Sequence, residues 1–247
     1  GELHGGYFSD PAIARHFLEA AAGAATVSRP KTVVDLGGGT GFLLSMLRSH
    51  GIGTGTALVN LDCSAAQLAV SNEAGISSVR ATLDSFKRSD IAPPGSRILF
   101  IMRSVLHYFG ESGLSPVLRH IRAQAAEGEF LVHQTACFDN EREAACLNAL
   151  YRLMRTAKWY PTVGELQTKS ADAGWRAEAI SPAPALLLTS DELAVRYSLD
   201  KADVAGIRNT MAAEFGDMDG VFVVTAGGFQ ARLQYRIFRC RAEKTRG

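Results

Sequence analysis

The sequence predicts an α/β protein whose central sheet is mostly parallel and is covered by helices on both faces. Two observations predict this fold class. Short runs of branched apolar residues alternate with amphipathic segments up to about residue 136, as parallel strands and crossover helices do. Near the end of the chain, two strand-like runs flank Gly227–Gly228, which is a hairpin signal. We therefore expect an antiparallel C-terminal hairpin to complete the sheet.

The predicted elements follow in order along the first part of the chain. The first helix is expected to begin at Pro11, with Asp10 as its N-cap. Predicted strands and helices alternate from there, with strands at 32–36, 56–62, 76–81, 97–103 and 129–136, and helices at 11–23, 41–50, 64–75 and 114–128.

The second part of the chain is predicted to be mainly helical. Four helical patterns precede the C-terminal hairpin, at 140–157, 161–174, 189–200 and 201–216. No segment rich in Pro, Gly and Ser separates the two parts. We expect a single domain over 1–247, with a cofactor-binding core at about 10–136 and acceptor-pocket helices with closing strands at about 137–247.

Composition disfavours several classes of partner. The 247 residues carry a formal net charge of +1, so no strong field would attract nucleic acid or an anionic membrane. No apolar run is long enough to cross a bilayer. The four cysteines have no C-x-x-C spacing, which favours a reduced cytoplasmic protein over a disulfide framework.

A glycine-rich turn, in "VVDLGGGTGFLLSML" at 33–47, joins the first predicted strand to a helix. Backbone N–H groups at such a helix start favour an anionic or carboxylate ligand. A dinucleotide turn requires G-x-G-x-x-G, but Phe42 stands where its last glycine would be, three positions after Gly39. A P-loop requires a lysine directly after its last glycine, but the residue after Gly41 is Phe42. Both phosphate-binding interpretations are therefore disfavoured.

Asp35, Gly37, Gly39 and Gly41 instead resemble the first motif of the class I S-adenosylmethionine-dependent methyltransferases, and in particular the small-molecule, natural-product type. The resemblance implies a Rossmann-like class I methyltransferase fold with inserted helices over the active site. It also implies S-adenosyl-L-methionine as cofactor and S-adenosyl-L-homocysteine as product. The acidic residue would help to hold the amino acid end of the cofactor.

The resemblance covers about residues 10–136 and includes two further acidic positions. Asp62 ends the second predicted strand, where a carboxylate can accept both ribose hydroxyls, although it could also cap the next helix. Asp84, in "ATLDSF", resembles the acidic residue on the adenine side, or is a solvated loop residue. Neighbouring cofactor-binding positions implied by the resemblance are Cys63, Leu83, Ser85 and Arg103.

His107 follows the fourth predicted strand, where open α/β sheets bind ligands. The stretch "LHYFGE" resembles the strand end of plant phenolic O-methyltransferases, whose histidine removes the proton of the acceptor hydroxyl. His107 is the candidate catalytic base, or it packs the strand end. Those plant enzymes carry a helical dimerisation domain before the motif, while about 30 residues precede it here, so the base assignment stays open. His133, at the end of the fifth predicted strand, is a second candidate, or it caps polar groups of that strand.

Residues outside the sheet core are expected to bind the acceptor. Tyr7 and Phe8 lie beside glycines in "HGGYFSD", a composition suited to a lid. Arg152, Trp159 and Tyr160 are close in sequence and could receive a flat, carboxylated acceptor together with His133, or could anchor the inserted helices.

The most favoured function is methyl transfer to a small-molecule acceptor in specialised metabolism, with O-methylation preferred over N- or C-methylation. A macromolecule methyltransferase is the second alternative, but an RNA-modifying enzyme usually needs a basic surface, and this sequence has no cluster of Lys and Arg to supply one. A nicotinamide oxidoreductase or a scaffold protein of the same fold is the third alternative. No acidic cluster follows the fourth or fifth strand, so no metal is expected. Assembly into a homodimer is left open by the sequence.

Overall fold

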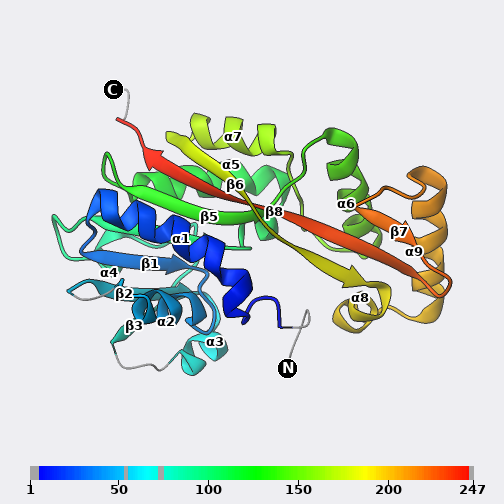
Figure 1. Cartoon of the computed structure of the whole chain (residues 1–247), viewed down its shortest axis with the longest axis horizontal. Helices are drawn as coiled ribbons and strands as arrows, with labels where there is room; N and C mark the ends of the chain where they lie inside the picture. Colours follow the sequence, from blue (N-terminus) through cyan, green and yellow to red (C-terminus); the bar gives the residue numbers. More distant parts are fainter. Residues whose placement is uncertain (1–5, 53–54, 72–74, 245–247) are drawn as a thin grey trace.

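The computed structural model describes residues 6–52, 55–71 and 75–244. Within them the chain forms one eight-stranded sheet with the strand order β3-β2-β1-β4-β5-β8-β6, and β7 pairs with β8 (Figure 1). The strands are β1 Thr32–Leu36, β2 Ala57–Asp62, β3 Ile76–Arg80, β4 Ile98–Arg103, β5 Phe130–Ala136, β6 Trp175–Thr189, β7 Phe222–Val224 and β8 Phe229–Ala242.

The first five strands are parallel, and β8 pairs with β5 and β6 in the antiparallel sense. Every residue of β1 and β5 is buried, as expected for strands covered on both faces. The predicted fold class is therefore confirmed. The antiparallel hairpin around Gly227–Gly228 is confirmed as well, since Val224 pairs with Phe229.

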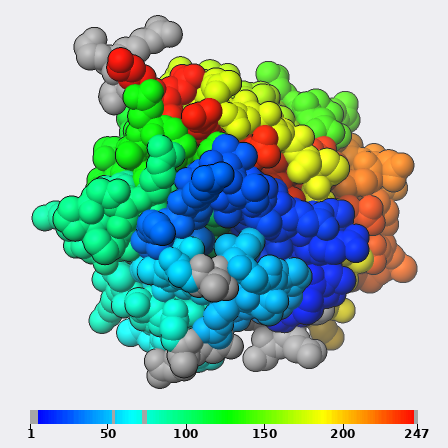
Figure 2. All heavy atoms as spheres, turned by 60° about the vertical axis from the view of Figure 1, so that its left-hand side comes forward, coloured from blue at the N-terminus to red at the C-terminus, as the bar shows by residue number. Residues whose placement is uncertain are grey.

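Helices cover the sheet on both faces. They are α1 Pro11–Ser28, α2 Phe42–Ser49, α3 Ala65–Val70, α4 Arg88–Ile91, α5 Gly110–Ala123, α6 Glu141–Leu153, α7 Val163–Asp172, α8 Ser190–Tyr197 and α9 Lys201–Glu214, with a short 3-10 helix η1 at Leu106–Phe109. Val33 of β1 packs in one apolar cluster with α1 and α2, while Val34 packs in a second with α5 and α7. Figure 2 shows α1 in dark blue above the lighter blue residues that follow it and beside the red end of β8.

A third apolar cluster lies where β6 and β8 extend beyond the parallel strands. The distal parts of these two strands and β7 pack with α6, α8 and α9 (Figure 1). Tyr7 and Tyr160 belong to this cluster. The helical second part of the chain therefore packs on one end of the long β6–β8 ribbon.

Strand β6 was not predicted. Its sequence "WRAEAISPAPALLLT" contains Pro182 and Pro184, which argue against a strand interior. β6 is an edge strand, where proline is tolerated, and its register with β8 shifts twice, between Ala177 and Ala179 and between Ala183 and Leu186. Edge position and irregular register therefore explain why the apolar pattern did not reveal it.

Several predicted boundaries differ from those observed. Helix α1 continues to Ser28, α5 begins at Gly110 with Pro116 in its first turns, and α4 and η1 were not predicted. Helix α6 ends at Leu153 rather than at 157, with Arg155 in the left-handed region at φ 59°. Helix α3 ends at Val70, and positions 72–74 of the helix predicted over 64–75 lie outside the described residues, as do positions 4 and 5 of the predicted lid.

Candidate active site

The glycine turn lies at the carboxyl edge of the parallel strands, between β1 and α2. A Cβ atom on Gly38 would lie 2.6 Å from the carboxylate of Asp35 and would also overlap the side chain of Asn60. The turn therefore passes directly over these two side chains. At Gly39, φ is +57° and the nearest atom to an added Cβ would be a side-chain oxygen of Gln67 at 3.7 Å, so this side of the turn is open to a ligand.

Asp62 and the glycine turn are hydrogen-bonded to each other. Oδ2 of Asp62 accepts from the backbone N–H of Gly39 at 3.0 Å, and Oδ1 accepts from the N–H of Ser64 at 2.8 Å. Ser64, not Asp62, caps α3, because its hydroxyl oxygen accepts from the N–H of Gln67. Each carboxylate oxygen of Asp62 keeps a further lone pair that a hydroxyl could use.

Asn60 also holds the glycine turn, and it was not among the residues predicted from the sequence. Its side-chain N–H groups donate to the carbonyl oxygen of Gly39 and to the hydroxyl of Ser71, both at 2.9 Å. Asn60 is fully buried in β2. A buried amide in an otherwise apolar strand needs a polar partner, so a lone Asn inside "TALVNLD" was the available signal.

Asp35 lies beneath the turn and is 1% exposed. Neither of its carboxylate oxygens has a hydrogen-bond partner among the described residues. Burial raises the pKa of Asp35 to about 7, the nearby Arg103 opposes this rise, and Asp62 adds to it. A buried carboxylate without a donor is costly, so Asp35 is a group that a ligand ammonium would stabilise.

Arg103 ends β4, and burial lowers the pKa of its guanidinium while Asp35 opposes that effect. One of its nitrogens donates to the carbonyl oxygen of Phe8, and the guanidinium lies 5.5 Å from the ring centroid of Phe8 and 5.6 Å from that of Phe42. Asp35, Asp62 and Arg103 therefore converge from three neighbouring strand ends.

The loop after β3 carries the predicted adenine-side residues. Leu83 is buried, while Asp84 and Ser85 are exposed, and Asp84 and Ser85 both hydrogen-bond to the hydroxyl of Thr82. Cys63 is exposed beside Asp62. An apolar residue and an exposed carboxylate thus stand together at this end of the site.

His107 lies in η1, directly after β4, and is 5% exposed. Its ring centroid is 5.4 Å from that of Tyr160 and 4.2 Å from that of Tyr108, and its Nδ1 has no hydrogen-bond partner among the described residues. Burial, with a smaller effect of Lys158 and Arg196, lowers the pKa of His107 well below its usual value of 6.5. The imidazole is therefore neutral near pH 7.

The described part of the predicted lid, residues 6–10, lies across the carboxyl edge of the sheet. The Tyr7 hydroxyl donates to the carbonyl oxygen of Pro184 and accepts from the side-chain amide of Gln134 at 3.1 Å. The Tyr7 ring stacks on Tyr235 with 5.6 Å between centroids. Gln134 and Tyr235 were not predicted as site residues, because only the tertiary structure brings β5 and β8 to this segment.

The remaining predicted acceptor residues are not all brought together. Trp159 and Tyr160 lie beside His107, since the N–H of Trp159 donates to the His107 carbonyl oxygen at 3.2 Å. Arg152 is exposed on α6. His133 is fully buried in the middle of β5, not at its end as predicted, and its ring stacks on Phe238 at 4.8 Å between centroids. Burial lowers the pKa of His133 to about 3.

Solved structures with this arrangement are known at low sequence identity. YcgJ protein from Bacillus subtilis is 12% identical, over 93% of this chain and 99% of that chain, with a TM-score of 0.68. A putative methyltransferase from Bacillus halodurans is 12% identical, over 91% of this chain and 99% of that chain, with a TM-score of 0.68. Human N-acetylserotonin methyltransferase, solved in complex with SAM, is 15% identical, over 94% of this chain and 53% of that chain, with a TM-score of 0.55.

The chain has the class I methyltransferase fold. At these identities the likeness establishes the fold. No protein-family model and no curated protein matches the sequence.

The residues at the carboxyl edge fit the cofactor of this methyltransferase fold. Asp35 presents a buried carboxylate without a donor, Gly38 leaves no room for a side chain above it, and Gly39 faces open space. Asp62 adds carboxylate oxygens beside the turn, one of which accepts from the N–H of Gly39. The ammonium of such a cofactor would meet Asp35, and its ribose hydroxyls would meet Asp62. The glycine turn would let the backbone approach the cofactor closely.

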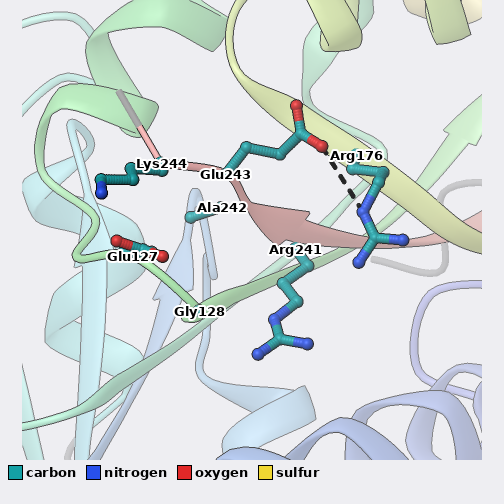
Figure 3. A pocket seen from close by; sticks show the side chains of 7 residues that line it. All are labelled: Glu127, Gly128, Arg176, Arg241, Ala242, Glu243 and Lys244. Carbon is teal, nitrogen blue, oxygen red and sulfur yellow. Dashed lines mark ion pairs between the residues drawn. The ribbon is translucent and has the colours of Figure 1, made fainter. Parts of the chain in front are cut away.

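A cleft lies at the edge of the sheet opposite the glycine turn. It has a volume of about 210 Å³ and is shown in Figure 3. Its side chains come from the ends of β6 and β8 and from the turn before β5, and they include Glu127, Arg176, Arg241, Glu243 and Lys244. Arg176 and Glu243 form an ion pair at 3.5 Å. This cleft is separated from the glycine turn by the length of the parallel strands.

No group of three or more His, Cys, Asp or Glu side chains is placed to hold a metal ion in residues 6–52, 55–71 and 75–244. Among the same residues, no helix has the length and apolar character needed to cross a membrane.

Proposed function

We propose that the protein transfers the methyl group of S-adenosylmethionine to a small-molecule acceptor, with an oxygen as the preferred nucleophile. The observation that carries the proposal is the convergence of Asp35, Gly38 and Asp62 at the carboxyl edge of β1 and β2. These three features suit a nucleoside that carries an ammonium group. Asp35 is a buried carboxylate without a donor, Gly38 has no space for a Cβ atom, and Asp62 is a second carboxylate.

The cofactor-binding residues have separate roles in this proposal. Asp35 binds the ammonium of the methionine part, because an ionised partner removes the cost of its own burial. Asp62 accepts the ribose hydroxyls while it keeps the N–H of Gly39 in place. Leu83 packs on the adenine ring and Asp84 accepts from its amino group. Bound S-adenosylmethionine supplies a methyl group on a sulfonium with a good leaving group.

His107 is the proposed proton acceptor for an acceptor hydroxyl. Its pKa is lowered mainly by burial, so the imidazole is neutral at physiological pH and one of its two ring nitrogens carries no proton. The rings of Tyr108 and Tyr160 pack against the imidazole. These contacts restrict its orientation, which favours its alignment with the acceptor hydroxyl. Oxygen is preferred because a neutral amine or an electron-rich carbon has less need of a base.

The segment around Tyr7 and Phe8 is proposed to exclude water from the site. Its hydrogen bonds to Pro184 and Gln134 and its stacking on Tyr235 hold it across the strand ends. Excluding water strengthens the interaction of Asp35 with an ammonium.

Incubation with S-adenosylmethionine labelled in its methyl group tests this function. A lysate of the source organism, separated into small-molecule, RNA and protein fractions, provides the acceptors. We expect the label in the small-molecule fraction, with loss of labelling in an Asp62→Ala control. Label recovered in RNA or protein would contradict the proposal, and mass spectrometry of the labelled product would show whether O, N or C carries the methyl group.

A further inference from the structure

Lys158 is a basic residue beside the candidate base that the proposed function has not used. It lies in the connection between α6 and α7, directly before Trp159, whose N–H is bonded to the carbonyl oxygen of His107. Its Nζ lies 4.7 Å from the ring centroid of Tyr108, the residue after His107. Lys158 is therefore held against η1 at the acceptor side of the site.

Tyrosines surround the ammonium of Lys158. Nζ donates a 2.9 Å hydrogen bond to the hydroxyl of Tyr197. It also lies 5.6 Å from the ring centroid of Tyr151 and 5.5 Å from that of Tyr197. These rings come from α6 and α8, and Tyr108 comes from η1, so three separate elements provide flat walls around one cation.

A second basic residue faces Lys158. Arg196 of α8 donates to the Tyr108 hydroxyl at 3.4 Å, and the neutral ring of His107 lies against that of Tyr108, with 4.2 Å between the ring centroids. No carboxylate lies within ion-pair distance of Lys158 in the described part of the chain. Partial burial, with a smaller contribution from Arg196, lowers the pKa of Lys158 to about 8.

A partly buried ammonium without a carboxylate is unfavourable. Cation–π contacts with three rings offset part of that cost, but a tyrosine hydroxyl is a weaker partner than an anion. An anionic oxygen brought to Nζ would satisfy the ammonium and would bring an attached aromatic ring against the tyrosine walls.

We propose that Lys158 binds the carboxylate of an aromatic acceptor and so places that acceptor beside His107. This inference rests on the proposed function, because it names the acceptor class of the same site. It assigns to Lys158 the anion-binding role that the sequence suggested for Arg152, which is exposed on α6.

Calorimetry with matched probes tests the inference. Hydroxybenzoates and hydroxycinnamates are compared with their uncharged amides, with and without S-adenosylhomocysteine. We expect the acids to bind wild type at least tenfold more tightly than the amides. Lys158→Met should weaken acid binding at least tenfold and leave amide binding unchanged, whereas Lys158→Arg should retain most of the acid affinity. Lys201→Met, an exposed position at the start of α9, is the control.

Two results would overturn the inference: wild type that binds acids no better than amides, or a folded Lys158→Met variant that binds acids as wild type does. The first result does not depend on the stability of any variant. S-adenosylhomocysteine binding by wild type is recorded in the same experiments. If it fails while the acid preference and its dependence on Lys158 are observed, the proposed function fails and the Lys158 site stands.

Discussion

The backbone N–H of Gly39 donates a 3.0 Å hydrogen bond to Oδ2 of Asp62 across two strand ends. The second oxygen of the same carboxylate accepts from Ser64 at 2.8 Å. Asp62 therefore fixes the glycine turn before any ligand is bound, in addition to its proposed contact with the ribose. Substitution of Asp62 is therefore expected to affect both the glycine turn and the binding of the ribose.

Asp62→Ala is expected to weaken binding of S-adenosylhomocysteine by about 1–3 kcal/mol, since two hydroxyls and two backbone donors lose their acceptor. Asp62→Asn should lose less, because its amide oxygen can still accept from one of these donors. Calorimetry measures both. Asp172→Ala, at the exposed end of α7, is the control. Unchanged affinity in folded Asp62→Ala would remove Asp62 from the ribose site.

Asp35 is expected to make stability depend on pH in a direction unusual for an aspartate. Burial raises its pKa from 3.8 to about 7, so the folded state holds a proton that the unfolded state has lost. Stability from this residue is complete below about pH 4 and falls as pH rises to about 7. Asp35→Asn should therefore raise the melting temperature more at pH 8 than at pH 5. An equal change at both values, measured by calorimetry, would contradict the buried, unpaired state of Asp35.

His107→Gln is expected to lower kcat by about 10²–10⁴-fold for a hydroxyl acceptor. Because burial keeps the pKa of His107 well below 6.5, wild-type kcat should show no loss between pH 8 and pH 6.5 from protonation of this group. The variant should recover activity as pH rises and the acceptor ionises. Its affinity for S-adenosylhomocysteine should be close to that of wild type.

The alternative role for His107 is packing against Tyr108 and Tyr160. In that case Gln would reduce kcat little, and the loss would appear partly in KM. A folded variant with near-normal kcat at every pH would exclude proton transfer by His107.

Activity is expected to survive exhaustive treatment with a chelator. Asp139, the acidic residue nearest the end of β5, is ion-paired with Arg236 at 2.8 Å, and Glu141 begins α6. Among the described residues, neither belongs to a group of three or more His, Cys, Asp or Glu side chains that could hold a metal ion. The measurement is product formation before and after chelation, and activity that is lost and then restored by Mg²⁺ would show a metal requirement.

The sheet and the cofactor-side residues could be predicted because their signals are local. Asp35, Asp62 and the glycines lie at strand ends that apolar runs define, and parallel topology brings such ends to one edge. Strand β6 could not be predicted, since Pro182 and Pro184 interrupt its pattern and only pairing with β8 makes it a strand.

The acceptor side was harder to predict because its residues meet through tertiary contacts. Lys158, Tyr108 and Tyr197 come from a loop, a 3-10 helix and a helix that no sequence period connects. For His133 the sequence left open a ligand contact or a capping role at a strand end, and the fold places it in the middle of β5, buried against Phe238.

Calorimetric titration of the full chain with S-adenosylhomocysteine, beside a parallel titration with NADH, tests whether the carboxyl edge of the sheet binds the proposed cofactor. We expect saturable one-site binding of S-adenosylhomocysteine, with Asp62→Ala weaker by about 1–3 kcal/mol, and no binding of NADH. Binding of NADH without binding of S-adenosylhomocysteine would show that the protein is not a methyltransferase.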